Sequence, residues 1–255
     1  MKRTHRHQLK ENDLARSLTA ARDAIQQHRS QIVIALIAAA IIAVGIAAIT
    51  LWQQRTNAQA DALLAEATVV LNTRVIPPTT EGQAPGELPA AATMGAEGSF
   101  PSEAARYTAA LPRLEATVDA YPDTPAGITA RYHYAAALGA LGRHDEAIQA
   151  FDEVVDRAGT DSFYGRMARF GKADTQMRAE QIDASIATWQ ELAASADESL
   201  PQDAILMELA RAYVAKGNEE EARRTFAQIV QEHPMSPYSA EARAEMGNEP
   251  ILLTN

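Results

Sequence analysis

The sequence predicts an all-α protein in which a single membrane-spanning helix near the N-terminus precedes a solenoid of paired helices. Two observations carry this prediction. Residues 32–51 form an uncharged, apolar stretch of membrane-spanning length. The remaining chain repeats one small-then-large apolar pattern at intervals of 37, 38 and 37 residues. Periods of this size are typical of stacked helix pairs.

Residues 32–51 contain seven Ile, two Val, two Leu and seven Ala, interrupted only by Gly45 and Thr50. A helix rises about 1.5 Å per residue, so this stretch spans about 30 Å, the thickness of a bilayer's hydrocarbon core. Its strongly apolar side chains favour insertion by about 3–6 kcal/mol. We therefore expect a transmembrane helix at residues 31–52. A cleaved signal peptide is the alternative, because residues 58–60 (Ala-Gln-Ala) resemble a cleavage site, but the stretch exceeds the roughly 7–15 apolar residues of a signal peptide.

The charges on either side of this stretch predict its orientation. Residues 1–30 carry seven Lys or Arg against three acidic residues, whereas the 20 residues after the stretch carry one basic residue, Arg55. The positive-inside rule therefore places the N-terminus in the cytoplasm and exports the C-terminal part, with Trp52 at the interface. Residues 53–255 carry a net charge of −14, which argues against binding to nucleic acid.

The basic residues 1–30 also carry an apolar stripe. Leu14, Leu18, Ala21 and Ile25 fall on one face of a helix. We expect a cytoplasmic amphipathic tail, for which two interpretations stay open. The tail rests against anionic lipid headgroups, or it docks onto another membrane protein.

The exported part contains four copies of one helical unit. In each copy a small residue precedes a large apolar one by four positions: Ala110 and Leu114, Ala147 and Phe151, Ser185 and Trp189, Ala222 and Phe226. Gly142 and Gly217 lie five residues ahead of the second and fourth copies, where a turn between paired helices needs a left-handed residue. The predicted repeat core consists of Leu114, Ala147, Phe151, Trp189, Tyr213, Ala222 and Phe226.

These residues resemble the signature of the tetratricopeptide repeat. The best copy matches it at Leu209, Ala210, Tyr213, Gly217, Ala222, Phe226, Ile229 and Pro234. The copy around Gly142 matches well, whereas the middle copy has Glu180 where the turn glycine would be. The resemblance implies a solenoid whose first helices line a concave, partner-binding groove. Carried over by position, the groove residues are Tyr132, Met167, Phe170, Asp174, Met177, Arg178, Met207 and Arg211.

Two interpretations of these groove residues stay open. The three methionines fit an adaptable peptide-binding surface, because methionine is common on promiscuous surfaces. Arg178 and Arg211 would then hold a carboxylate or an acidic motif. Alternatively, the Met and Phe side chains fill a tight superhelix that has no open groove.

The sequence also predicts the extents of the remaining segments. Residues 53–73 continue as an apolar-periodic helix, the outgoing helix of a first repeat that pairs with a helix in residues 102–121. Residues 74–101 are rich in Pro, Gly and Ala without periodicity and are predicted to be a disordered insertion. Residues 102–247 hold the repeats with a C-terminal cap, and residues 248–255 form a flexible tail.

No motif indicates catalysis. The six histidines show no metal-ligand spacing, and Gly171-Lys172 lacks the upstream glycines of a phosphate loop. The acidic residues between positions 145 and 156 follow the outer face of a predicted helix, where solvated charge is the ordinary explanation. We expect a protein that is not an enzyme and has no catalytic, cofactor-binding or metal site.

The whole layout resembles the tetratricopeptide-repeat ancillary subunit of the bacterial Sec translocon. That resemblance implies a single-pass protein of the bacterial inner membrane, with periplasmic repeats, that passes secreted chains to chaperones. Its partners would be Sec translocon subunits, periplasmic chaperones or secreted chains. A scaffold that coordinates envelope assembly or cell division is the alternative, and an assembly factor for a redox complex is a third. Homo-oligomerisation stays open.

Overall fold

A computed structural model describes residues 29–76, 98–195 and 200–247. Its helices are α2 (Arg29–Leu71), α3 (Glu103–Ala120), α4 (Pro125–Ala140), α5 (His144–Ala158), α6 (Phe163–Arg178), α7 (Ile182–Ala193), α8 (Gln202–Lys216), α9 (Glu219–Glu232) and α10 (Ser239–Glu245). These three ranges contain no strand, so the all-α prediction is confirmed. The amphipathic part of the predicted tail and the predicted flexible tail at 248–255 lie outside the described residues. The chain divides into two units, residues 1–55 and residues 56–255.

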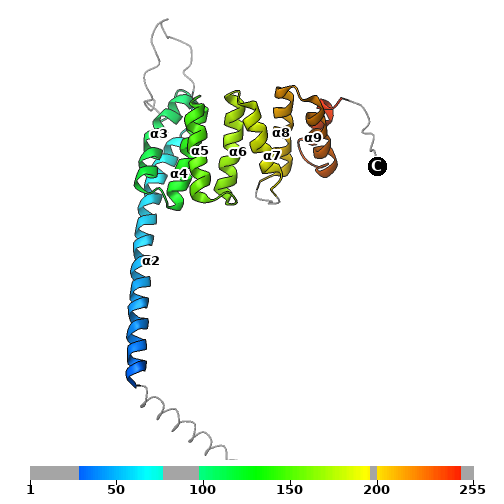
Figure 1. Ribbon diagram of the computed structural model, residues 1–255. Helices are drawn as coiled ribbons and strands as arrows, with labels where there is room; N and C mark the ends of the chain where they lie inside the picture. Colours follow the sequence, from blue (N-terminus) through cyan, green and yellow to red (C-terminus); the bar gives the residue numbers. More distant parts are fainter. Residues whose placement is uncertain (1–28, 77–97, 196–199, 248–255) are drawn as a thin grey trace, which may run out of the picture. The chain divides into compact units, whose positions relative to one another are not determined.

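In the first unit, the described part is α2 from Arg29 to Arg55 (Figure 1). More than half of the surface of its large apolar side chains is exposed: Val33, Ile34, Leu36, Ile37, Ile41, Ile42, Val44, Ile46, Ile49 and Leu51. Exposing an apolar surface of this extent to water is unfavourable, so such a surface marks a contact with a membrane or with another protein. The helix is long and apolar enough to cross a membrane, which agrees with the predicted span.

The second unit is a series of helix pairs. Each helix from α3 to α9 packs against the next one in the sequence (Figure 1). α4 also contacts α6, and α6 contacts α8, so the first helices of successive pairs lie next to each other. The N-cap residues of α3, α4 and α6 are Ser102, Thr124 and Ser162, whose hydroxyl oxygens each accept a hydrogen bond from a backbone N–H in the first turn.

Three clusters of buried side chains form the core of this unit. The end of α2 packs against α3 around Leu114. α4, α5 and α6 share a second cluster around Phe151, and a third extends from α6 to α10 around Trp189. All seven residues of the predicted repeat core are buried within these clusters. The small and large apolar residues of the repeat thus lie on the faces where consecutive helices meet.

The turns inside three helix pairs share one geometry. Gly142 and Gly217 adopt left-handed φ angles of 76° and 77°, and Glu180 occupies the matching position with a φ of 60°. In each turn the next residue's N–H donates to the carbonyl five positions earlier: Arg143 to Leu138, Gln181 to Gln176, and Asn218 to Tyr213. This hydrogen bond belongs to the Schellman motif. The middle repeat therefore keeps the turn without its glycine.

Replacing Glu180 by glycine should raise the free energy of unfolding by about 0.5–1 kcal/mol. A residue with a Cβ is disfavoured in the left-handed region, whereas glycine is not. Guanidinium denaturation of the full chain in detergent, followed by circular dichroism, measures this change. The control Glu180→Ala keeps the Cβ and should give no comparable gain. Equal stability of the glycine and alanine variants would contradict the explanation.

The prediction of disorder across residues 74–101 is wrong at both ends of that segment. Val75 and Phe100 form an isolated parallel bridge. The N–H of Ile76 donates to the Phe100 carbonyl, and the N–H of Phe100 donates to the Arg74 carbonyl, each at 2.9 Å. Phe100 is buried with Leu114 in the first core cluster. Val75 packs against the same cluster. The bridge and these two apolar side chains therefore order the ends, and two residues so far apart produce no periodicity in the sequence. Residues 77–97 lie outside the described part.

A candidate partner-binding pocket between α4 and α6

α4 and α6 border a pocket of about 270 Å³, which is called the α4–α6 pocket below. Its lining comes from the two first helices of successive pairs together with one ring from α5. The lining residues are Tyr132, Ala136, Gly139, Ala140, Phe151, Phe170, Gly171, Asp174, Thr175 and Arg178. Small residues and aromatic rings dominate this set, which suits a pocket that accepts an apolar side chain.

Aromatic packing fixes the position of the lining. The Tyr132 ring lies 5.9 Å from the Phe151 ring and 6.1 Å from the Tyr164 ring, measured between centroids. Gly171 lies directly against Phe151, because a Cβ at position 171 would come within 2.5 Å of the ring's Cζ atom. The close approach of α6 to α5 therefore depends on the missing side chain at Gly171.

Two charged side chains stand at the edge of the pocket. The Nε of Arg178 donates to the Oδ2 of Asp174 at 2.9 Å, across one turn of α6. Both side chains are substantially solvent-accessible, and exposed pairs of this kind stabilise a fold very little. The guanidinium and the carboxylate can therefore exchange their mutual contact for charged or polar groups of a bound segment.

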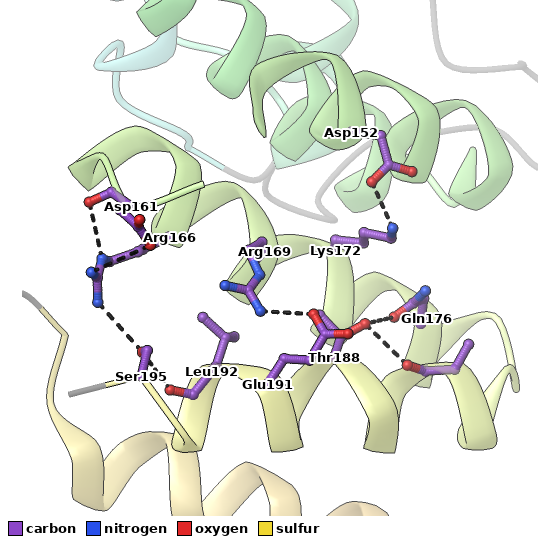
Figure 2. Close-up of polar contacts among 11 residues, drawn as sticks. Asp152, Asp161, Arg166, Arg169, Lys172, Gln176, Thr188, Glu191, Leu192 and Ser195 are labelled. Carbon is purple, nitrogen blue, oxygen red and sulfur yellow. Dashed lines mark hydrogen bonds and ion pairs between the residues drawn. The ribbon is translucent and has the colours of Figure 1, made fainter. Parts of the chain in front are cut away.

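Basic side chains of α6 form ion pairs with the helices on either side of it (Figure 2). The Lys172 Nζ lies 2.6 Å from the Asp152 Oδ1 on α5. The Arg169 Nη2 lies 2.8 Å from the Glu191 Oε2 on α7. These two ion pairs connect α6 to both flanking helices, and they contribute little to stability because their carboxylates are exposed.

Further polar contacts continue along the same helix (Figure 2). Arg166 donates to the Asp161 carbonyl at 3.2 Å and to the Ser195 hydroxyl at 3.4 Å. The Thr188 hydroxyl donates to the Gln176 Oε1 at 3.0 Å. Sequence reasoning overlooked these residues, because single charges on a helix resemble a solvated face. The sequence pattern that could have predicted them is the row of basic residues at positions 166, 169 and 172, which follows one side of α6.

Burial shifts the pKa values of two side chains beside the pocket. It raises the pKa of the Tyr132 hydroxyl, and the nearby Tyr164 raises it further. Burial also lowers the pKa of His133, whose ring stands edge-on to the Tyr132 ring at 5.5 Å. Both side chains are therefore neutral at neutral pH.

The free energy of unfolding should fall as the pH decreases below about 6.5, in part because of His133. The unfolded chain binds a proton at the ordinary histidine pKa of about 6.5, whereas the folded chain binds it only at lower pH, so acid favours unfolding. Denaturant titrations at about pH 7.5 and about pH 5.5 measure this difference. The His133→Gln variant should lose less stability between these two pH values than the native chain. An equal loss in both would show that His133 does not contribute.

The sequence matches a known repeat family over both halves of the solenoid. A profile of the tetratricopeptide repeat matches residues 102–162 and 170–240, which together make up more than half of the chain. The chain belongs to the tetratricopeptide repeat family. No curated protein matches the sequence.

Two similar solved structures are forms of a Podosopora anserina putative kinesin light chain with nearly identical TPR-like repeats. The first, a form with a single substitution, is 22% identical with a TM-score of 0.49, and covers 56% of this chain and 76% of its own. The second is 21% identical with a TM-score of 0.49, and covers 56% of this chain and 77% of its own.

Four of the eight predicted groove residues of this tetratricopeptide repeat solenoid line the α4–α6 pocket: Tyr132, Phe170, Asp174 and Arg178. The placement of Met207 in an open groove is wrong, because its side chain is 0% exposed within the cluster that extends from α6 to α10. Met177 also packs against that cluster. The helices after α6 surround these two methionines, so they contribute to the core rather than to the pocket.

The other two predicted groove residues lie apart from the pocket lining. Met167 is half-buried on α6 but does not line the pocket. Arg211 is paired with Glu208 at 2.6 Å and with Glu241 of α10 at 2.7 Å. Side-chain hydrogen bonds to Glu241 are the main reason that the pKa of Arg211 is raised. Arg211 thus links α8 to the last helix of the tetratricopeptide repeat solenoid.

Proposed function

We propose that this chain is a membrane-anchored adaptor that associates with the Sec translocon of the bacterial inner membrane. Its N-terminus lies in the cytoplasm, its repeats lie in the periplasm, and it passes secreted chains to chaperones. The observation that carries the proposal is the α4–α6 pocket with its charged edge, on a chain that also has an exposed apolar helix of spanning length. Tetratricopeptide repeats typically bind proteins rather than catalyse reactions, which supports a non-enzymatic role.

The chemistry of the pocket fits an extended segment of a secreted chain. Tyr132 and Phe170 offer aromatic surface to one apolar side chain. Arg178 can donate to a carboxylate or a backbone carbonyl, and Asp174 can accept from a backbone N–H. Such a pocket holds a segment by one anchor side chain and by polar groups that many sequences share. That combination suits a protein that receives different chains in turn.

Affinity capture in mild detergent, followed by mass spectrometry, tests the proposal. The native chain is compared with one in which residues 32–51 are replaced by an unrelated transmembrane helix. Recovery of translocon subunits only with the native span would support the adaptor. Recovery of envelope-assembly or division proteins with either span would instead favour a scaffold that acts through its repeats alone.

A second pair of variants separates the pocket from the rest of the surface. Arg178→Glu reverses the charge at the edge of the α4–α6 pocket, and Arg223→Glu makes the same change at an exposed position on α9. We expect the first variant to lose crosslinks from the repeats to a secreted chain and the second to keep them. Equal crosslinking by both variants would exclude the α4–α6 pocket as the binding site.

A further inference from the structure

The last described helix, α10, is built like the first helix of a further pair. In the turn before α10, the N–H of Ser236 donates to the His233 carbonyl at 3.0 Å. The turn before α4 contains the equivalent hydrogen bond at 3.2 Å. At the same distance after these turns, Ala242 of α10 and Ala130 of α4 are each 0% exposed. α10 therefore takes the place of a first helix, but no second helix follows it within the described ranges.

In the three complete pairs, the position directly after this buried residue is covered. Arg131 of α4 forms an ion pair with Glu153 of α5. Arg169 of α6 forms the equivalent ion pair with Glu191 of α7 at 2.8 Å. The two arginine side chains are only 11% and 13% exposed. Leu206 of α8 takes this position in the third pair and is 2% exposed. The position thus belongs to the contact between a first and a second helix.

The equivalent position of α10 is uncovered. It is occupied by Arg243, which is exposed and makes no ion pair with any described residue. One turn later, Gly247 is exposed as well, whereas Ala135 and Ala173 at the same position of α4 and α6 are each 0% exposed. The face of α10 that corresponds to a helix contact therefore carries an unpaired positive charge and an open small residue.

The turn before α10 has a second uncovered contact. Met235 is 94% exposed, the largest value among the exposed large apolar side chains of the described ranges. Asp123 takes the same position in the turn before α4, and its carboxylate pairs with Arg157 in the last turn of α5. The position of Met235 is thus one that contacts the end of a second helix, and covering its side chain would remove apolar surface from water.

We propose that a helix of a partner protein packs against α10 and completes this pair as its second helix. The second helices α5 and α7 indicate the sequence that such a helix needs. Each has a buried aromatic residue, a glutamate two positions later and a buried aliphatic residue directly after it: Phe151, Glu153 and Val154 in α5, and Trp189, Glu191 and Leu192 in α7.

The partner helix would repeat the contacts of the complete pairs. Its glutamate pairs with Arg243, as Glu153 and Glu191 pair with their arginines. Its last turn covers Met235 with an apolar side chain. Two arguments favour this occupant, namely the charge of Arg243 and the equivalence of the α10 face with helix contacts already present in the solenoid. The site is separate from the α4–α6 pocket and does not depend on the function proposed for it.

Fluorescence anisotropy with a labelled peptide tests the proposal on the full chain in detergent. The peptide has the sequence of residues 181–195, which contains the aromatic residue, glutamate and leucine of α7, and is capped at both ends. A second peptide carries the change Glu191→Lys. The chain variant Arg243→Glu reverses the charge on α10, and the control Arg223→Glu makes the same change at an exposed position on α9.

We expect the first peptide to bind the native chain and the control equally, and its Kd to rise about tenfold with Arg243→Glu. The lysine peptide should show the reverse preference and bind Arg243→Glu more tightly than the native chain, because the exchanged charges again attract. Equal Kd values of the first peptide for the two variants would overturn the proposal, since the peptide would then bind elsewhere on the repeats. Failure of the native chain to bind the first peptide would also overturn it. Circular dichroism verifies that both variants are folded.

Discussion

Substitution of both Ile41 and Ile42 by lysine should release the chain from membranes. These two side chains are exposed near the middle of the apolar part of α2. A lysine at the centre of a span costs about 2.5–3.5 kcal/mol, so the pair costs about 5–7 kcal/mol. The apolar residues of the span favour insertion by only about 3–6 kcal/mol. Fractionation of cells after alkaline carbonate extraction measures the shift from the membrane to the soluble fraction.

A double substitution by another apolar residue controls for the loss of the two isoleucine side chains. Ile41→Leu/Ile42→Leu keeps the apolar surface of the span, so this variant should remain with the membrane. Retention of the double-lysine variant in the carbonate-resistant fraction would show that α2 is not what anchors the chain. The anchor would then be another segment or a membrane-bound partner.

Truncation of Trp189 to alanine should lower the free energy of unfolding by about 3–5 kcal/mol. Its side chain is fully buried and is among the largest in the core. The ring contacts Phe170 edge-on, with 4.6 Å between the centroids, so removal leaves a cavity between α6 and α7. Chemical denaturation of the repeats, followed by circular dichroism in detergent, measures the loss.

The variant Trp189→Phe separates packing from hydrogen bonding. The indole Nε1 is buried without a hydrogen-bond partner among the described residues, so phenylalanine removes no hydrogen bond. We expect this variant to lose less than half of the stability that Trp189→Ala loses, because most of the aromatic contact remains. If both variants lost the same amount, the cavity would not be the cause.

The order of the helices and the positions of their turns could be predicted from the sequence. The small and large apolar residues recur at a nearly constant interval, and they lie on the faces where consecutive helices meet. Gly142 and Gly217 were predicted as left-handed positions, and both have that conformation. Each of these features is local, because periodicity and turn chemistry depend on a few neighbouring residues.

The candidate site was predicted only in part. Tyr132, Phe170, Asp174 and Arg178 line the α4–α6 pocket, whereas Met207 is buried in the core. The same face of the repeat thus lines a pocket in one copy and the core in another. The difference comes from the helices packed around each copy: α8 is enclosed by α7, α9 and α10, and no repeat signature records that enclosure.

The sequence by itself determined the position of the apolar span, the helical repeat and the spacing of the buried residues in each repeat. Composition and periodicity are enough to specify these features. Only the tertiary structure decided how closely individual helices approach each other. α6 lies so close to α5 that a Cβ at Gly171 would come within 2.5 Å of the Cζ atom of Phe151. Likewise, the ion pair between Arg131 and Glu153 joins α4 to α5. Such contacts depend on the distance between helix axes, which the packing of all the core side chains sets together.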